Sequence, residues 1–521
     1  MAVLPRFLPT RLLELNRFEP SKDLRLVRSE DIASPNDILY TTLSHCWGEK
    51  SSVRGPTKTL SSNIKQRQVR IQFDELSTTF QDAVRISRGL GVNYLWIDSL
   101  CIVQDSQDDW EAEASKMGRV YANSYCTLAA SSSQDSGGGC IRGFQRTGFT
   151  KGPRYIDIEK GPYSMRIFEK SPLDWDREFN RGPLRTRAWT LQERELSLRV
   201  VHFSQSLLLW ECKTMKGSSE LPWFQMKHED PPASLLLNSA ADCVGNGESL
   251  HRREYWYRTV EDFCARNLTV EMDKLPALAG LAQREHEFRH SRYLAGLWQD
   301  DLPSALLWRS SRFTLREGIE GIPASRPTGY RAPSWSWASV NGSISYDSQR
   351  SWQSSSLDVR DRQSEFVYHD FQILDTSLNE TSHEIMGSVS SGHIRVRGCL
   401  KPAIIDLANV KSQIHDEHYL IRTMNGTKAG IVYPDSVPEF EDRQIIYCLR
   451  VRDEVHHSKI EVPYGLYDDL CGNKETLESM IMGLALSPIP DEKNTYQRVG
   501  LVRFIKLSCF EGGDISELIL I

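Results

Sequence analysis

The clearest hydrophobic pattern in the chain lies at residues 94–97, where the sequence reads YLWI. A short run of aromatic, β-branched and other apolar residues is typical of a strand that is covered on both faces. Asp98 and Ser99 follow directly, so they lie at the carboxyl end of the predicted strand. Open α/β sheets bind ligands at that end. Asp98 and Ser99 are therefore candidates for ribose or substrate contacts, or else they cap the following turn.

A helix is predicted next, beginning at Ser106 or Asp108, because short polar side chains cap helix N-termini. Its apolar residues recur at helical spacing, and Glu113 lies at the edge of this apolar face. A carboxylate in that position is either paired or functional. The predicted face is formed by Trp110, Ala114, Met117 and Tyr121.

The flanking segments repeat the alternation of strand and helix. A strand at 38–43 ends in Ser44, and helical spacing over 76–90 is followed by strands at 94–97 and 125–130. The order strand, helix, strand, helix, strand indicates a parallel sheet covered by helices. Further predicted elements are an edge strand at 24–27, a hairpin around 155–168, a helix at 186–193, and strands at 199–203 and 207–212.

The remaining chain divides by pattern into four further regions. Residues 1–35 form a short preamble before the α/β domain of 36–215, and 216–340 are predominantly helical, with segments at 255–266, 275–285, 294–298 and 302–308. Residues 341–390 are rich in Ser, Gln and Asp, which predicts a linker. Residues 391–521 alternate in short β-like runs, which predicts a small β-rich module.

Composition excludes several classes of protein. The 521 residues carry a formal net charge of −6, which gives no electrostatic case for nucleic-acid binding. No apolar run approaches the ~20 residues of a membrane helix. The N-terminus is a poor secretory signal, because Pro5, Arg6, Pro9 and Arg11 interrupt it. The eleven cysteines form no CxxC pair, so buried reduced thiols and a cytoplasmic location are expected.

Four motifs occur in an order that resembles the fungal heterokaryon incompatibility (HET) domain. Further matches at 273–278, 293–298 and 331–338 resemble the extension of long HET-domain proteins. The four motifs are YTTLSHCWG at 40–48, LWIDSLCIVQD at 95–105, MGRVY at 117–121 and RAWTLQER at 187–194.

The resemblance implies a role in non-self recognition that triggers programmed cell death when unlike fungal cells fuse. HET domains are similar to TIR domains, which implies a flavodoxin-like parallel sheet with helices on both faces. Some TIR domains cleave NAD with a glutamate in a Trp-x-x-Glu pattern, and Trp110 and Glu113 have that spacing. Glu113 is thus the catalytic candidate, with NAD as the candidate substrate and no cofactor identified. The alternative is a helix-flank glutamate paired with Arg85, Arg119 or Arg187.

Six further residues are candidates for contacts to such a nucleotide. An aromatic ring can stack on the base or nicotinamide, and a guanidinium binds phosphate through two hydrogen bonds. Each also has a structural interpretation, in particular Arg187, whose helix also carries Trp189 and Glu193 and fits docking onto the sheet with internal pairing of Glu193. The candidates are Ser44, Trp47, Asp98, Ser99, Trp110 and Arg187.

The HExxH sequence at 286–290 matches the zinc-peptidase pattern, but no glycine-and-histidine extension follows it, so no metal site is expected there. Two further functions remain open beside NAD cleavage. One is a non-catalytic recognition scaffold that signals through partner-driven assembly. The other is a HET-like domain recruited to secondary metabolism. The expected partners are proteins of an incompatibility pathway or copies of the chain itself.

Overall fold

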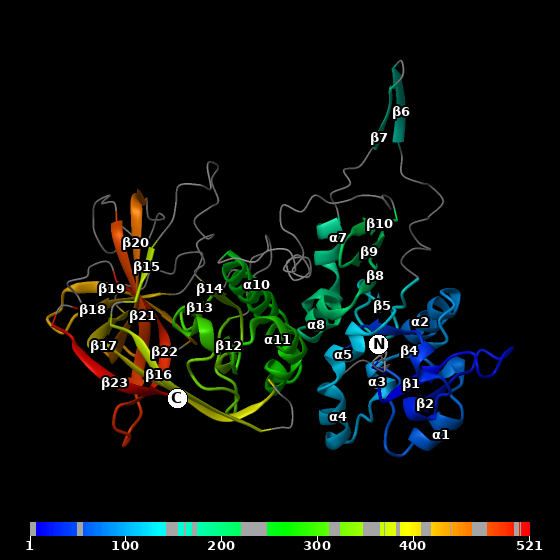
Figure 1. Ribbon diagram of the computed structural model, residues 1–521, viewed down its shortest axis with the longest axis horizontal. Helices are drawn as coiled ribbons and strands as arrows, with labels where there is room; N and C mark the ends of the chain where they lie inside the picture. Colours follow the sequence, from blue (N-terminus) through cyan, green and yellow to red (C-terminus); the bar gives the residue numbers. More distant parts are fainter. Residues whose placement is uncertain are drawn as a thin grey trace, which may run out of the picture. The chain divides into compact units, whose positions relative to one another are not determined.

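The computed structural model describes residues 7–48, 56–141, 155–160, 163–168, 175–219, 247–311, 323–346, 365–368, 370–381, 386–407, 418–437, 439–460, 477–504, 510 and 512–521. The chain forms two compact units (Figure 1). The first contains Met1–Glu248 and Ala277–Leu281, and the second contains Ser249–Pro276 and Ala282–Ile521. Each unit contains one large β-sheet.

The sheet of the first unit has eight strands in the order β10-β9-β8-β5-β3-β4-β1-β2. Its central strands β8, β5, β3 and β4 are parallel, and the outer strands on both sides are antiparallel to their neighbours. The strands are β1 (Arg11–Glu14), β2 (Arg25–Arg28), β3 (Tyr40–Ser44), β4 (Tyr94–Trp96), β5 (Cys126–Ala129), β8 (Arg199–Phe203), β9 (Leu208–Cys212) and β10 (Lys216–Ser218).

The parallel strands have the flavodoxin-like order. Numbered along the chain, β3, β4, β5 and β8 are strands 1 to 4, and their order across the sheet is 2-1-3-4. The predicted α/β fold is therefore confirmed. In this topology the strand order reverses between β3 and β5, and ligands bind outside the carboxyl ends of the strands at that point.

Helices cover both faces because successive side chains of a strand point to opposite sides. On β3, the Thr41 hydroxyl contacts Ser87 of α2, and the neighbouring Tyr40 hydroxyl donates to the Val120 carbonyl of α5. The helices of this unit are α1 (Ile64–Val69), α2 (Thr78–Gly89), α3 (Asp98–Cys101), α4 (Gln107–Ala114), α5 (Met117–Ala122), α7 (Trp175–Arg181) and α8 (Trp189–Leu196).

Two strands extend this sheet before residue 36, where the α/β domain is predicted to begin. β1 pairs antiparallel with β4, so that Leu13 faces Leu95, and β2 forms the sheet edge beyond it. The edge strand predicted at 24–27 is thus confirmed. The hairpin predicted around 155–168 is also present, as β6 (Tyr155–Lys160) and β7 (Tyr163–Phe168).

The helix predicted to run from Trp110 to Tyr121 is interrupted. α4 ends at Ala114 and α5 begins at Met117, with a turn at Ser115 and Lys116 between them. The prediction of one continuous apolar face was therefore wrong. The predicted N-cap is confirmed, because the Ser106 hydroxyl accepts a hydrogen bond from the Asp109 backbone N–H.

The second unit begins with helices and two small hairpins. The prediction of a helix at 294–298 was wrong, because β11 and β12 form a hairpin whose turn residues Ala295 and Gly296 have φ values of 44° and 103°. The indole N–H groups of Trp256 and Trp337 both donate to the Gly296 carbonyl. The elements are α10 (Gly247–Cys264), α11 (Pro276–Arg289), α12 (Leu302–Ala305), β11 (Tyr293–Leu294), β12 (Leu297–Trp298), β13 (Trp308–Ser310) and β14 (Ile344–Tyr346).

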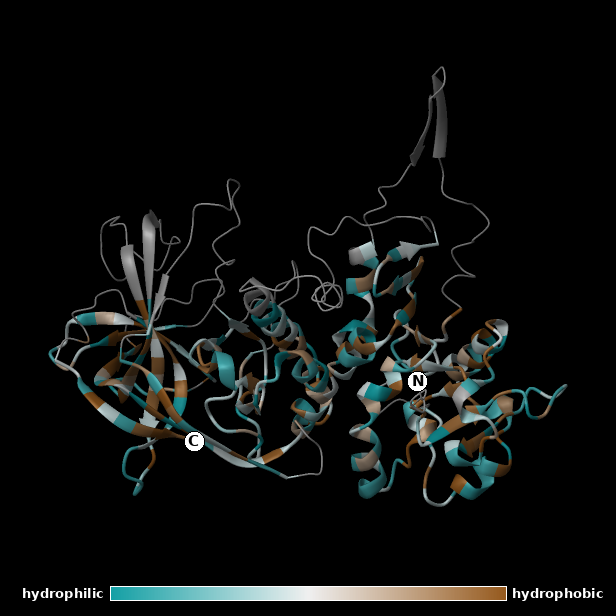
Figure 2. Ribbon diagram, viewed as in Figure 1, coloured by the Kyte–Doolittle hydropathy of each residue, from teal (hydrophilic) through white to brown (hydrophobic). Residues whose placement is uncertain are grey.

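A nine-stranded sheet follows, which confirms the predicted β-rich module. Hydrophobic and polar residues alternate along its strands (Figure 2). β14, β15 and β16 lie within residues 341–390, so part of the stretch predicted as a linker is sheet. The strands are β15 (Glu365–Val367), β16 (Gln372–Glu380), β17 (Val389–Asp406), β18 (Tyr419–Arg422), β19 (Lys428–Pro434), β20 (Ile445–Ile460), β21 (Leu477–Pro488), β22 (Thr495–Phe504) and β23 (Asp514–Leu520).

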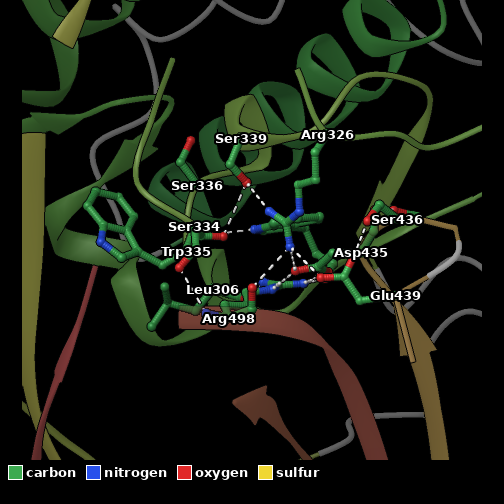
Figure 3. Close-up of polar contacts among 12 residues, drawn as sticks. Leu306, Arg326, Ser334, Trp335, Ser336, Ser339, Asp435, Ser436, Glu439 and Arg498 are labelled. Carbon is green, nitrogen blue, oxygen red and sulfur yellow. Dashed lines mark hydrogen bonds and ion pairs between the residues drawn. The ribbon is translucent and has the colours of Figure 1, made fainter. Parts of the chain in front are cut away.

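A buried arginine joins the sheet of the second unit to the segments before it. Arg498 and Asp435 are fully buried and form a bidentate ion pair with both N–O distances at 3.0 Å (Figure 3). The same guanidinium donates to the carbonyls of Leu306 and Trp308 and lies 3.6 Å from the centre of the Trp308 ring. Arg498 therefore fixes residues 306–308 against the carboxyl-terminal sheet.

Candidate functional site

A polar cluster occupies the carboxyl edge of the parallel sheet. Ser44 is the last residue of β3, and Asp98 follows β4 after one residue. Because parallel strands end at the same edge, these two side chains come from adjacent strands to the same place. This edge includes the reversal of strand order between β3 and β5, where the fold is expected to bind a ligand.

Glu193 of α8 reaches this edge from one face of the sheet. The Ser44 hydroxyl donates to the Glu193 carboxylate, although the two residues are 149 positions apart. Tyr121 of α5 lies beside them, because its hydroxyl also interacts with Glu193. Glu193 is 5% exposed, so its carboxylate is almost completely removed from solvent.

Burial raises the pKa of Glu193 from 4.5 to about 7, and the negative charge of Asp98 adds to this effect. The Arg187 guanidinium and the hydrogen bonds from Ser44 and Tyr121 oppose it. A carboxyl group that titrates near neutral pH can act as an acid or a base. Two nearby carboxyl groups in different environments are a common arrangement in sites that perform acid–base chemistry.

Asp98 is held in place from two directions. The Trp47 indole N–H donates to Asp98 Oδ2 at 2.8 Å, and the Ser99 backbone N–H donates to Asp98 Oδ1 at 2.6 Å. The Asp98 side chain remains 19% exposed. The Trp47 ring is half-buried, with Lys58 Nζ 4.9 Å from its centre.

His45 and Arg187 complete the cluster. Burial lowers the pKa of His45 to about 4, so the imidazole is neutral at physiological pH. Its Nδ1 lies 3.9 Å from Asp98 Oδ1, and its Nε2 is buried without a hydrogen-bond partner. Arg187 donates to the His45 carbonyl oxygen. The structure thus brings the predicted residues Ser44, Trp47, Asp98 and Arg187 together.

Among the described contacts, the side chains of the other two predicted residues make none with this cluster. The Ser99 hydroxyl donates to the Thr57 carbonyl at 3.1 Å, so its side chain faces the segment at 56–59. Trp110 is half-buried on α4.

Glu113 is buried at the end of α4 and is engaged in a local ion pair. It is 3% exposed, and it accepts hydrogen bonds from Thr10 Oγ1 at 2.6 Å and Lys116 Nζ at 2.9 Å. The structural interpretation named Arg85, Arg119 or Arg187 as its partner, but the cation that pairs with it is Lys116. The break between α4 and α5 lies at this lysine.

Glu193 is the residue of this cluster that the sequence interpretation did not select. It was assigned an internal structural pairing, although it lies on a helical segment with apolar residues, as Glu113 does. The signal that distinguishes it is its position between Leu191 and Leu196, which are buried on α8. A carboxylate on the buried face of a helix points into the protein rather than toward solvent.

The HExxH sequence and the predicted buried cysteines lie outside this cluster. Within the described ranges, no group of three or more His, Cys, Asp or Glu side chains is arranged to hold a metal ion. His286 of the HExxH sequence is exposed, and its Nδ1 lies 3.0 Å from the Ser291 carbonyl oxygen. Cys101, Cys126 and Cys448 are buried, as predicted. None of the helices that the structure describes is long and apolar enough to span a membrane.

The fold and the cluster define a doubly wound α/β domain with a polar site at its switch point. Residues 40–193 match the family model described as heterokaryon incompatibility protein (HET). The chain therefore carries a HET domain, and this match supports involvement in fungal heterokaryon incompatibility. Comparisons with curated proteins and with solved structures found no match.

The pKa of Glu193 predicts how stability depends on pH. The folded state holds a proton on Glu193 up to about pH 7, whereas the unfolded state releases it near pH 4.5. Protonated Glu193 therefore contributes to the free energy of unfolding in full below pH ~4.5, and this contribution is lost as the pH rises through ~7. The free energy of unfolding decreases by at most about 3 kcal/mol over this pH range. Denaturant titrations from pH 4.5 to 8 should show this decrease, and Glu193→Gln should reduce it. An equal decrease in the variant would contradict the assignment.

Proposed function

We propose that the chain is a HET-domain protein of fungal non-self recognition that triggers programmed cell death, and that its HET domain signals by cleaving NAD. The proposed site is the polar cluster at the carboxyl edge of the parallel sheet. The observation that carries the proposal is the hydrogen bond from Ser44 to Glu193, a buried carboxyl group with a pKa of about 7 at the switch point of the sheet. NAD is proposed as the substrate because HET domains resemble TIR domains, some of which cleave NAD.

The chemistry of the cluster suits a dinucleotide. A guanidinium such as that of Arg187 binds phosphate oxygens, and an indole such as that of Trp47 stacks on a planar base. The Asp98 carboxylate is a suitable acceptor for ribose hydroxyl groups. Cleavage of the bond between ribose and nicotinamide builds positive charge on the ribose, as in glycoside hydrolysis, and a nearby carboxylate stabilises that charge.

Two carboxylates are candidates for this stabilising role. Glu113 is the candidate from the sequence pattern, and Glu193 is the candidate from the geometry of the cluster. Glu193 is favoured, because it contacts Ser44 and interacts electrostatically with Arg187 and Asp98. Glu113 forms an ion pair with Lys116. The positive charge of Lys116 weakens the electrostatic attraction between Glu113 and a ribosyl cation.

A non-catalytic scaffold is the second candidate function. It is favoured by the number of contacts that the cluster already makes within the chain, since Trp47, Ser44 and Arg187 each donate to another residue of the same domain. In this alternative, assembly with a protein partner or with further copies of the chain transmits the signal without bond cleavage. Assembly is also compatible with the enzymatic proposal, in which copies of the chain would complete the pocket.

Glu113→Gln tests the two carboxylates against each other. With Glu193 in the catalytic role, we expect Glu113→Gln to retain NAD cleavage within about threefold of wild type. It should lower stability by about 1–3 kcal/mol, because the hydrogen bonds from Lys116 and Thr10 then end on a neutral oxygen and Lys116 loses its charged partner. The measurement is NAD consumption by the purified chain, with the exposed α4 residue Glu111→Gln as the matched control. Loss of cleavage in Glu113→Gln alone would return the catalytic role to Glu113. Absence of cleavage by wild type favours the scaffold.

A further inference from the structure

Three buried polar side chains in the first unit form a connected relay. Ser131 Oγ lies 3.2 Å from His202 Nδ1, and His202 Nε2 lies 2.9 Å from Glu211 Oε1. Ser131 follows β5 by two residues, while His202 and Glu211 belong to β8 and β9. The three residues are 3%, 2% and 8% exposed. The Ser131 hydroxyl has one further contact, to the Ala129 carbonyl at 3.4 Å.

The charges around the relay determine where its protons are. Burial opposes ionisation of Glu211, but the Arg194 guanidinium and His202 hold the pKa of Glu211 well below its usual range. An ionised carboxylate can only accept hydrogen bonds, so His202 Nε2 must carry the hydrogen. Burial lowers the pKa of His202, which keeps its ring neutral. The other ring nitrogen, Nδ1, is therefore a lone pair that accepts the Ser131 hydroxyl proton.

This arrangement has the components of an activated serine. A carboxylate that orients a histidine and fixes its tautomer makes the second ring nitrogen a base for the serine hydroxyl. Arg194 anchors Glu211 through two hydrogen bonds and packs on Phe179 at 4.2 Å. The rings of Trp175 and Phe179 contact the His202 ring edge-on and restrict its rotation.

The serine lies next to the proposed NAD site, and the carboxylate borders a small cavity. The Ala130 backbone N–H donates to the Ser44 carbonyl at 2.9 Å, so Ser131 comes directly after the point where the pairing of β3 with β5 ends. At the other end of the relay, Glu211 and Arg194 line a small cavity together with Cys212 and Lys213. A proton taken from Ser131 therefore stays on His202, and the ionised Glu211 carboxylate stabilises the resulting imidazolium.

We infer that Ser131 is a nucleophile that accepts the ADP-ribosyl group of NAD, so that the chain modifies itself. This inference rests on the proposed function. The bond between ribose C1′ and the nicotinamide nitrogen breaks, and its electron pair leaves with neutral nicotinamide. A bond forms between Ser131 Oγ and C1′, and the hydroxyl proton passes to His202 Nδ1. No oxidant or further reactant is needed.

The test is incubation of the purified full chain with NAD, followed by intact mass measurement and peptide mapping. We expect a mass increase of one ADP-ribosyl group located on Ser131. Ser131→Ala should abolish this adduct, and His202→Gln should slow its formation at least tenfold. Ser124→Ala removes another buried serine hydroxyl, which donates to the Tyr121 carbonyl, and should leave the adduct unchanged.

Mapping on the wild-type chain decides the inference even if a variant fails to fold. NAD consumption without an adduct on Ser131 overturns the inference and leaves the proposed function standing. Absence of NAD consumption overturns both. An adduct that persists at the wild-type rate in His202→Gln, with the thermal unfolding midpoint retained, also overturns the relay.

Discussion

Replacing Glu193 by glutamine is expected to lower the rate of NAD cleavage by the purified chain at least about 100-fold, the range typical for loss of a group that acts in the transition state. Glutamine keeps the shape of the side chain and can still contact Ser44. It cannot ionise, so it removes the charge that would stabilise a ribosyl cation. The measurement is kcat/KM for NAD, with unfolding curves as the check on folding.

The same variant should be folded, which separates chemistry from stability. A neutral glutamine replaces a carboxyl group that burial already holds protonated up to about pH 7, so little stability is lost at or below neutral pH. Glu111→Gln on α4 is the matched control, because Glu111 is exposed and should keep the wild-type rate. Wild-type activity in folded Glu193→Gln would contradict the catalytic assignment.

Arg498→Met is expected to destabilise the second unit by about 3–5 kcal/mol, because it leaves Asp435 as a fully buried charge without its partner. The carbonyls of Leu306 and Trp308 lose a donor in the same step. Arg326 does not replace the lost cation, since its guanidinium lies 3.8 Å from Asp435 and is committed to Glu439 at 3.2 Å (Figure 3). The measurement is denaturant unfolding monitored by tryptophan fluorescence.

A double variant shows whether the buried charge is the cause. Arg498→Met combined with Asp435→Leu should recover at least about 2 kcal/mol relative to Arg498→Met, because replacing a whole buried ion pair by apolar residues is often close to neutral. The control Arg397→Met removes an exposed arginine on β17 and should change stability by less than about 0.5 kcal/mol. Equal stability of the single and double variants would contradict the explanation.

The elements that sequence pattern predicts well are those with strong local signals. The strand at β4, the helix at α2 and the Ser106 cap follow from short apolar runs, helical spacing and capping chemistry. The segment at 294–298 shows the limit of this approach. Its apolar residues fit a short helix or a strand equally, and the choice is made by two distant indole groups that converge on the Gly296 carbonyl.

The candidate site was predictable in outline but not in its central pair. Polar residues after β3 and β4 must meet at one sheet edge, which the alternation of strands and helices already implies. The contact between Ser44 and Glu193 depends on how α8 docks, and no spacing rule connects residues 149 positions apart. Lys116 beside Glu113 depends equally on the turn between α4 and α5, which interrupts a continuous helical pattern.

We propose that the cluster around Glu193 at the sheet edge is the working site of the HET domain. Wild type, Glu193→Gln and Glu113→Gln can be expressed at equal levels in a fungal host, and growth and cellular NAD measured together. We predict growth arrest with NAD depletion for wild type and Glu113→Gln, and neither effect for Glu193→Gln. Growth arrest with NAD depletion in Glu193→Gln would contradict the claim.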